Sequence, residues 1–84
     1  MNDEQVNNLK EIAEKTVKEI DEKITIHDFR IVVGPTHTNL IFDAVLPYGF
    51  GMTNSQFKEL ANKKINEYDS SLFAVIDIDQ AYIK

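Results

Sequence analysis

Two histidines and a pair of aspartates are the side chains of this sequence whose types could do chemistry. His27 lies in a segment rich in Ile, Val and Phe, and Asp77 and Asp79 alternate along a second apolar segment near the C-terminus. One imidazole with two carboxylates suits a divalent ion such as Zn²⁺, Mn²⁺, Fe²⁺ or Co²⁺. Alternate residues share one face of a strand, so Asp77 and Asp79 would repel each other there, and a cation would relieve that repulsion. His27, Asp77 and Asp79 are therefore the predicted metal ligands, whereas His37 is predicted to be either a plain exposed histidine or a turn residue that hydrogen-bonds its neighbours.

Catalytic motifs are missing from the chain. It has no GxSxG, no HExxH and no phosphate-binding glycine loop. Ser55, Ser70 and Ser71 stand where helix caps and turns use serine. The chain also has no cysteine, which removes thiol nucleophiles, cysteine metal sites and disulfides together. We therefore expect that the protein is not an enzyme.

Length and charge narrow the class of protein further. The 84 residues leave room for one domain, spanning 1–84, with a thin core that a partner subunit would help to stabilise. Fourteen acidic and nine basic residues give a net charge of −5, and the basic residues are scattered. Because nucleic-acid binding needs a positive patch, nucleic acid is not an expected partner. No apolar run has the length of a membrane span, and there is no signal-peptide core, so we expect a soluble domain.

Hydrophobic periodicity predicts five elements. Apolar residues at three- and four-residue steps predict an amphipathic helix over 3–22. Two segments rich in β-branched residues flank a cluster of turn formers, which predicts a hairpin with a loop longer than two residues. Thr53 and Gln56 fit a capping box at the start of a second helix, which runs to about residue 68. The three predicted strands are 24–33, 38–46 and 72–78.

The order helix, strand, strand, helix, strand predicts an α+β, ferredoxin-like α-β-β-α-β sandwich. Its three-stranded sheet would contain antiparallel strands and would carry both helices on one face. We expect the strand at 72–78 to lie beside the strand at 24–33, through a right-handed crossover. That placement would bring His27 close to Asp77 and Asp79.

Two details of the predicted hairpin bear on function. The apolar alternation of its first strand changes phase at His27-Asp28, which predicts a β-bulge there. The strands at 38–46 and 72–78 are apolar on both faces, yet two helices can cover one face only. A second subunit covering the other face would solve this, so we expect a homodimer.

The order and spacing of several short motifs resemble a known family. They are the run Ile26-His27-Asp28-Phe29-Arg30, the turn Gly34-Pro35-Thr36, a second apolar strand, and the closing Ala74-Val75-Ile76-Asp77-Ile78-Asp79. This pattern is similar to the cytoplasmic C-terminal domain of the cation diffusion facilitator metal transporters. The resemblance covers nearly the whole chain, from the first helix to Tyr82.

The resemblance implies a domain on the cytoplasmic face of the cell membrane, joined to the transmembrane domain of a dimeric exporter of Zn²⁺ or related ions. In that family the domain dimerises through its sheet region and binds metal near the dimer interface, which closes the two protomers together. His27 matches the family's first-strand ligand histidine, and Asp79 matches its terminal ligand aspartate. Asp77 and Phe42 stand where many members have histidines, and Asn54 or Ser55 stands near a third such position.

Two other functions remain open from the sequence. One is a purely structural dimerisation module of such a transporter, with a degenerate metal site and no ion bound. The other is a free-standing ferredoxin-like module that binds a small ligand, with Tyr48 and Phe50 of the loop 47–52 as its pocket wall. A chain that is a piece of a longer transporter fits the first, and a free-standing chain fits the second.

Overall fold

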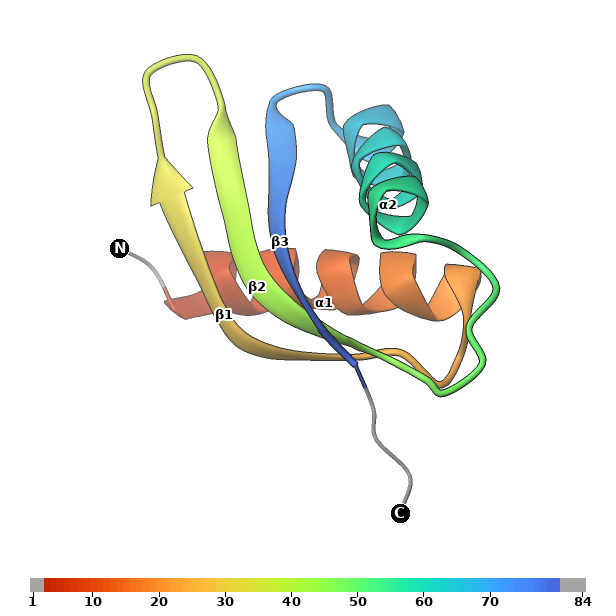
Figure 1. The fold of residues 1–84 in the computed structure, drawn as a ribbon. Helices are drawn as coiled ribbons and strands as arrows, with labels where there is room; N and C mark the ends of the chain where they lie inside the picture. Colours follow the sequence, from red (N-terminus) through yellow and green to blue (C-terminus); the bar gives the residue numbers. More distant parts are fainter. Residues whose placement is uncertain (1–2, 81–84) are drawn as a thin grey trace.

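The computed structural model describes residues 3–80 and confirms the predicted order of elements. Helix α1 ends at Ile20 rather than at residue 22, because the Asp21 carboxylate accepts a 2.9 Å hydrogen bond from the backbone N–H of Lys23 and turns the chain into the sheet. The five elements, drawn in Figure 1, are α1 (Asp3–Ile20), β1 (Thr25–Val33), β2 (Thr38–Leu46), α2 (Asn54–Tyr68) and β3 (Leu72–Gln80).

Strand β2 is the centre of a mixed three-stranded sheet. It pairs antiparallel with β1, as the hairpin predicted, and parallel with β3. The predicted position of β3 beside β1 is therefore wrong. The reason lies in β1, whose register against β2 shifts between His27 and Arg30. A bulged strand offers a broken row of amides to a further partner and is typically found at a sheet edge, whereas β2 is regular along its whole length.

The shift in β1 is the β-bulge that the sequence predicted. Asp28 has a φ of 54°, in the left-handed region, where aspartate is one of the few residues other than glycine that is well tolerated. The residues of β1 that pack against the core have even numbers before the bulge and odd numbers after it. The extra residue in the bulge keeps both groups on the helix-covered face. Phe29 then stacks on Phe42 with ring centroids 6.1 Å apart.

Both helices pack on one face of the sheet, as predicted, and that face holds the core (Figure 1). Helix α2 starts with the predicted capping box, in which the Thr53 hydroxyl accepts from the Gln56 N–H and the Gln56 side chain accepts from the Thr53 N–H. The helices contribute mainly small and branched residues, and the central strand contributes every second residue. The buried set comprises Ala13, Val17, Ile24, Ile31, Leu40, Phe42, Ala44, Leu46, Phe57, Ala61, Ile65, Leu72, Ala74 and Ile76.

Neither helix within the described part of the chain has the length and apolar character that crossing a bilayer would need.

Candidate functional site

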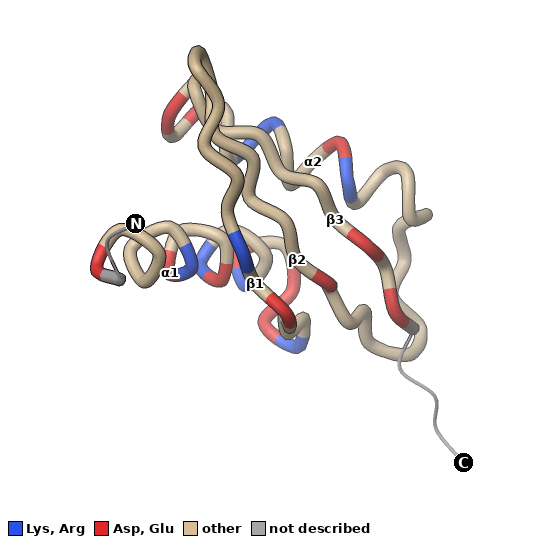
Figure 2. Tube along the Cα trace, turned by 90° about the vertical axis from the view of Figure 1, so that its left-hand side faces the viewer, with Lys and Arg blue, Asp and Glu red and all other residues tan. Residues whose placement is uncertain are grey.

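The face of the sheet that no helix covers carries the candidate site. Side chains alternate across a strand, so the residues between the core positions of β2 and β3 all point to this face. We call it the open face. One end of it is acidic and the other is apolar, and Figure 2 shows the acidic segments of all three strands gathered at the same end of the sheet.

The acidic end is organised by strand register. His27 on β1 is paired with Asp43 on β2, and Asp43 is paired with Asp77 on β3, so the three residues form one row across the sheet. Asp79 lies on the same face one row further along, opposite Val45. Asp28 joins them from the bulge, close enough to share a hydrogen bond with Asp43.

This arrangement corrects the predicted ligand geometry. His27 and the Asp77–Asp79 pair were expected on neighbouring strands, but β2 lies between them. Two inter-strand spacings separate the backbones of His27 and Asp77, a distance of roughly 10 Å. Among residues 3–80 no three His, Cys, Asp or Glu side chains converge in a way that could hold a metal ion within this single chain.

Asp43 is the residue that sequence reasoning missed. It is half-buried at the middle of the row, and its pKa is raised above the ordinary value, first because burial removes water from the carboxylate. The hydrogen bond with Asp28 and the negative charges of Asp28, Asp77 and Asp79 raise this pKa further. The sequence held a signal for it, since Asp43 is the one charge within the predicted strand 38–46 and has the parity opposite to Phe42 and Ala44.

The negative charges at the acidic end therefore act together on the Asp43 carboxyl group. Four carboxylates are spread along this end without converging on one point, and the exposed His27 imidazole is the side chain on the same row that could serve as a nitrogen ligand. A divalent cation at this end would be attracted by the carboxylates and would favour the ionised form of Asp43.

Replacing Asp43 with asparagine is expected to stabilise the metal-free protein at neutral pH. The raised pKa means that the folded state binds this proton more tightly than the unfolded state does, so wild-type stability falls as pH rises from 3.8 through the raised value. Asp43→Asn removes that fall, which thermal unfolding in chelator over a pH series would measure.

Asp69→Asn is the matched control for that series. The Asp69 carboxylate accepts hydrogen bonds from the Ser71 N–H and hydroxyl, at 2.9 and 2.7 Å, and these lower its pKa. It contributes stability above pH 3.8 that is lost as pH falls, so its removal should destabilise the protein at neutral pH. Destabilisation by Asp43→Asn as well would contradict the electrostatic origin of the Asp43 shift.

The apolar end of the open face adjoins the acidic end directly. Val32, Phe73 and Val75 are 51%, 42% and 52% exposed. On β2 the half-buried Ile41 lies between Arg30 and Val75, and Asn39 lies between Val32 and Phe73. Such a group of exposed apolar side chains on one face is typical of a surface that another protein covers.

His37 belongs to this apolar end rather than to the acidic one. Its ring packs edge-on against Phe73, with centroids 4.9 Å apart, and its Nδ1 lies 3.1 Å from the Thr36 hydroxyl. Of the two predicted roles, the structure therefore shows the exposed turn histidine that hydrogen-bonds its neighbour.

The loop 47–52, expected as a pocket wall, turns one of its two aromatic residues inward and the other outward. Phe50 packs inward against Phe57, with ring centroids 5.9 Å apart, and Tyr48 is exposed. Three grooves of the described region, of about 430, 270 and 310 Å³, are lined by residues of α1, α2 and Phe73.

Comparisons with known proteins bear on the fold. No protein-family model and no curated protein matches the sequence. A solved structure concerned with the mode of action of a candidate zinc transporter, CzrB, matches with a TM-score of 0.71 and 13% sequence identity. The match covers 98% of this chain and 99% of that one, so the two chains have nearly the same length. At this identity the likeness establishes a shared fold, and the chain has the α-β-β-α-β fold of that transporter structure along its described length.

Proposed function

We propose that this chain is the cytoplasmic regulatory and dimerisation domain of a divalent-cation efflux transporter, located at the cytoplasmic face of the membrane. The observation that carries the proposal is the row His27–Asp43–Asp77 across the open face. The fold shared with the candidate zinc transporter, over almost the whole of both chains, and the motif resemblance described above support the same reading.

The open face is the proposed dimer interface. Packing the apolar ends of two copies together would bury Val32, Phe73 and Val75, whose exposure in a single chain costs hydrophobic free energy. The same packing would bring two acidic ends near each other. Without a cation their charges repel, and this repulsion holds the acidic ends of the two copies apart.

A divalent ion near this interface would draw the two acidic ends together, because its positive charge offsets their mutual repulsion. His27, Asp77 and Asp79 remain the proposed ligands, with Asp43 beside them. Because they do not converge within one chain, each ion would take some of its ligands from one chain and the rest from the second. The ion binds the closed pair more tightly than the open pair, and it shifts the population by no more than that difference in affinity. Closure of the domain pair would then be passed to the transmembrane domain of the parent transporter.

Metal titration of the whole chain tests this proposal. We expect Zn²⁺, with Mn²⁺ in parallel, to make the dimer more compact in small-angle scattering. The triple variant His27→Ala/Asp77→Asn/Asp79→Asn should lose affinity by about tenfold or more, equivalent to about 1.4 kcal/mol per factor of ten. Asp69→Asn removes a carboxylate outside the open face and should leave the titration unchanged.

Either of two results would reject the metal-sensing role. The first is a wild-type dimer that does not change shape with metal, and the second is a triple variant that binds as tightly as the wild type.

A purely structural dimerisation domain is the second candidate, and the position of Phe42 favours it. Phe42 stands where many relatives of the resembled family have a ligand histidine, yet its side chain is 1% exposed and packed in the core. This candidate predicts an intact dimer with no heat of Zn²⁺ binding in calorimetry. A dimer disrupted by Val75→Asp, with metal binding absent throughout, would support it.

A further inference from the structure

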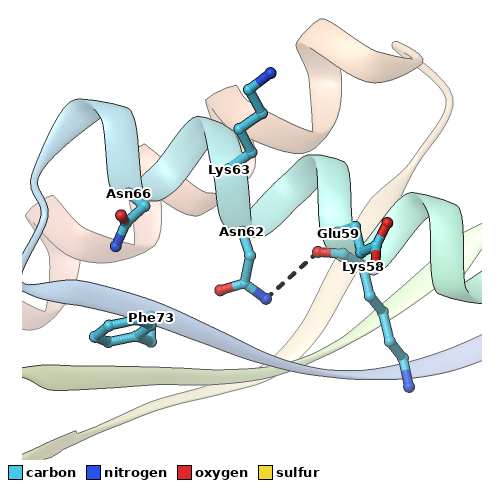
Figure 3. Close-up of a pocket in the computed structure, with 6 residues that line it drawn as sticks. All are labelled: Lys58, Glu59, Asn62, Lys63, Asn66 and Phe73. Carbon is cyan, nitrogen blue, oxygen red and sulfur yellow. Dashed lines mark hydrogen bonds between the residues drawn. The ribbon is translucent and has the colours of Figure 1, made fainter.

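Two asparagines of α2 close the outer edge of β3. The Asn62 side chain accepts a hydrogen bond from the Ala74 N–H at 2.8 Å and donates one to the Ala74 carbonyl at 2.9 Å. One turn further along α2, the Asn66 side chain donates to the Leu72 carbonyl at 3.1 Å. Figure 3 shows both amides pointing from α2 toward β3, whereas Lys63 points away from the strand.

These contacts imitate a neighbouring strand. The N–H and C=O of one strand residue point to the same side, and successive residues alternate sides. The backbone C=O of Ser71 points toward β2, because it accepts from the Thr38 N–H. The backbone groups of Leu72 and Ala74 therefore point away from β2. The two groups of Ala74 meet one donor and one acceptor of Asn62, as they would in a hydrogen-bonded antiparallel pair. The primary amide of asparagine offers an N–H donor and a carbonyl acceptor, as the peptide group of a neighbouring strand would.

The edge that lies beneath the asparagines is self-complementary. In an antiparallel pair of two β3 strands centred on Ala74, Phe73 of each copy would lie opposite Val75 of the other. Both side chains are exposed on the open face in the single chain. Aromatic and β-branched residues are a favourable cross-strand pair, and this register places Asp77 opposite Ser71 rather than opposite another carboxylate. An exposed edge of this kind is a template for pairing between copies.

We propose that Asn62 and Asn66 form an edge block that prevents β3 from pairing with the β3 strand of a second copy. The groove of about 430 Å³ that these residues line with Lys58, Lys63 and Phe73 is the space beside the edge that a partner strand would enter. The block concerns a surface other than the open face, so it does not depend on the proposed function. The test therefore compares the assembly state of each variant with that of the wild-type chain.

The experiment compares the double variant Asn62→Leu/Asn66→Leu with the wild type. Leucine has the same branched shape, with two methyl groups in place of the amide oxygen and nitrogen, and it cannot hydrogen-bond to the edge. We expect the mass of the variant in analytical ultracentrifugation to rise with concentration above that of the wild type. Hydrogen exchange at the Ala74 amide should become about tenfold faster in the dilute variant and protected again in the concentrated one.

Two control variants separate the edge block from other effects. Lys58→Leu/Lys63→Leu adds apolar surface to the same groove and leaves the asparagines in place, so its mass should follow the wild type. Ile65→Val lowers stability by removing a methyl group from the core, and the mass of this variant should also equal that of the wild type. Association of either control to the same degree as the variant would overturn the proposal, as would protection that appears elsewhere than on β3.

The proposal also makes a prediction for the wild type and for a milder variant, in case the double variant fails to fold. The Ala74 amide of the wild type should exchange as slowly as the amides inside the sheet, and Asn66→Leu alone should show weaker, concentration-dependent association. Fast exchange at Ala74 in the wild type, or a folded variant that never associates, would show that the asparagines do not block the edge.

Discussion

Phe42→Ala is expected to lower the free energy of unfolding by about 3–5 kcal/mol. Phe42 lies on the central strand with 1% of its surface exposed, and it stacks on Phe29 beside the bulge. Small domains are stable by only about 5–15 kcal/mol, so this single change would remove a large part of the total. Urea unfolding followed by circular dichroism measures it.

Phe73→Ala is the matched control for that measurement. Phe73 is also an aromatic residue of the sheet, but it is 42% exposed on the open face, so its loss should cost far less. Equal losses from the two variants would contradict the division of the sheet into a core face and an open face.

Phe42→His tests whether a histidine at this position could bind metal. We expect it to destabilise the protein substantially and to leave metal affinity unchanged, because residue 42 points to the helix-covered face and Asp43 to the opposite one. A polar imidazole in this core would lack a hydrogen-bond partner. A gain in Zn²⁺ affinity in calorimetry would show that the residue can turn toward the acidic end.

Gly34→Ala is expected to cost about 1–3 kcal/mol, although the change adds only one methyl group. A Cβ at Gly34 would stand 2.9 Å from the backbone carbonyl oxygen of His37, and that same oxygen accepts the Gly34 N–H at 2.8 Å to close the hairpin. The clash is with backbone, so relief requires the turn itself to move and His37 to shift from Phe73. Thermal and urea unfolding measure the cost.

Gly51→Ala provides the comparison for Gly34→Ala. A Cβ at Gly51 would have no atom within 4 Å, and its backbone is not in the left-handed region. The substitution should therefore be neutral, or stabilising by about 0.4–1 kcal/mol through the unfolded chain. If both glycine variants behaved alike, the close approach of the His37 carbonyl would not be the reason for glycine at position 34.

The sequence was sufficient to predict the elements, their order and the irregular points within them. Periodicity, the Thr53–Gln56 box and the phase change at His27-Asp28 are local signals, and each depends on interactions within a few residues. The order of strands is not local. A helix of the length of α2 could return the chain to either edge of the hairpin, and alternation describes which face a residue takes but not which edge is paired.

The predicted bulge nevertheless contained the missing information about strand order. A strand interrupted at Asp28 is a poor centre for a sheet, and this points to β2 as the central strand. With β2 in the centre, Asp43 becomes the middle of the acidic row, and the direct proximity of His27 to Asp77 is lost. Alternation along each strand was therefore enough to predict which face of the sheet each ligand takes. Which residues lie beside each ligand depended on the order of the strands.

The parallel pairing of β2 with β3 has a consequence for how the chain folds. The β1–β2 hairpin is joined by four turn residues and needs no other element to bring its strands together, whereas β3 reaches β2 only after the chain has passed through α2. Hairpins form within microseconds, but pairing of distant segments must first overcome the entropy of closing the intervening loop. We therefore expect the carboxylates of β3 to reach Asp43 in the last stage of folding, so that the acidic row and the native state are completed together.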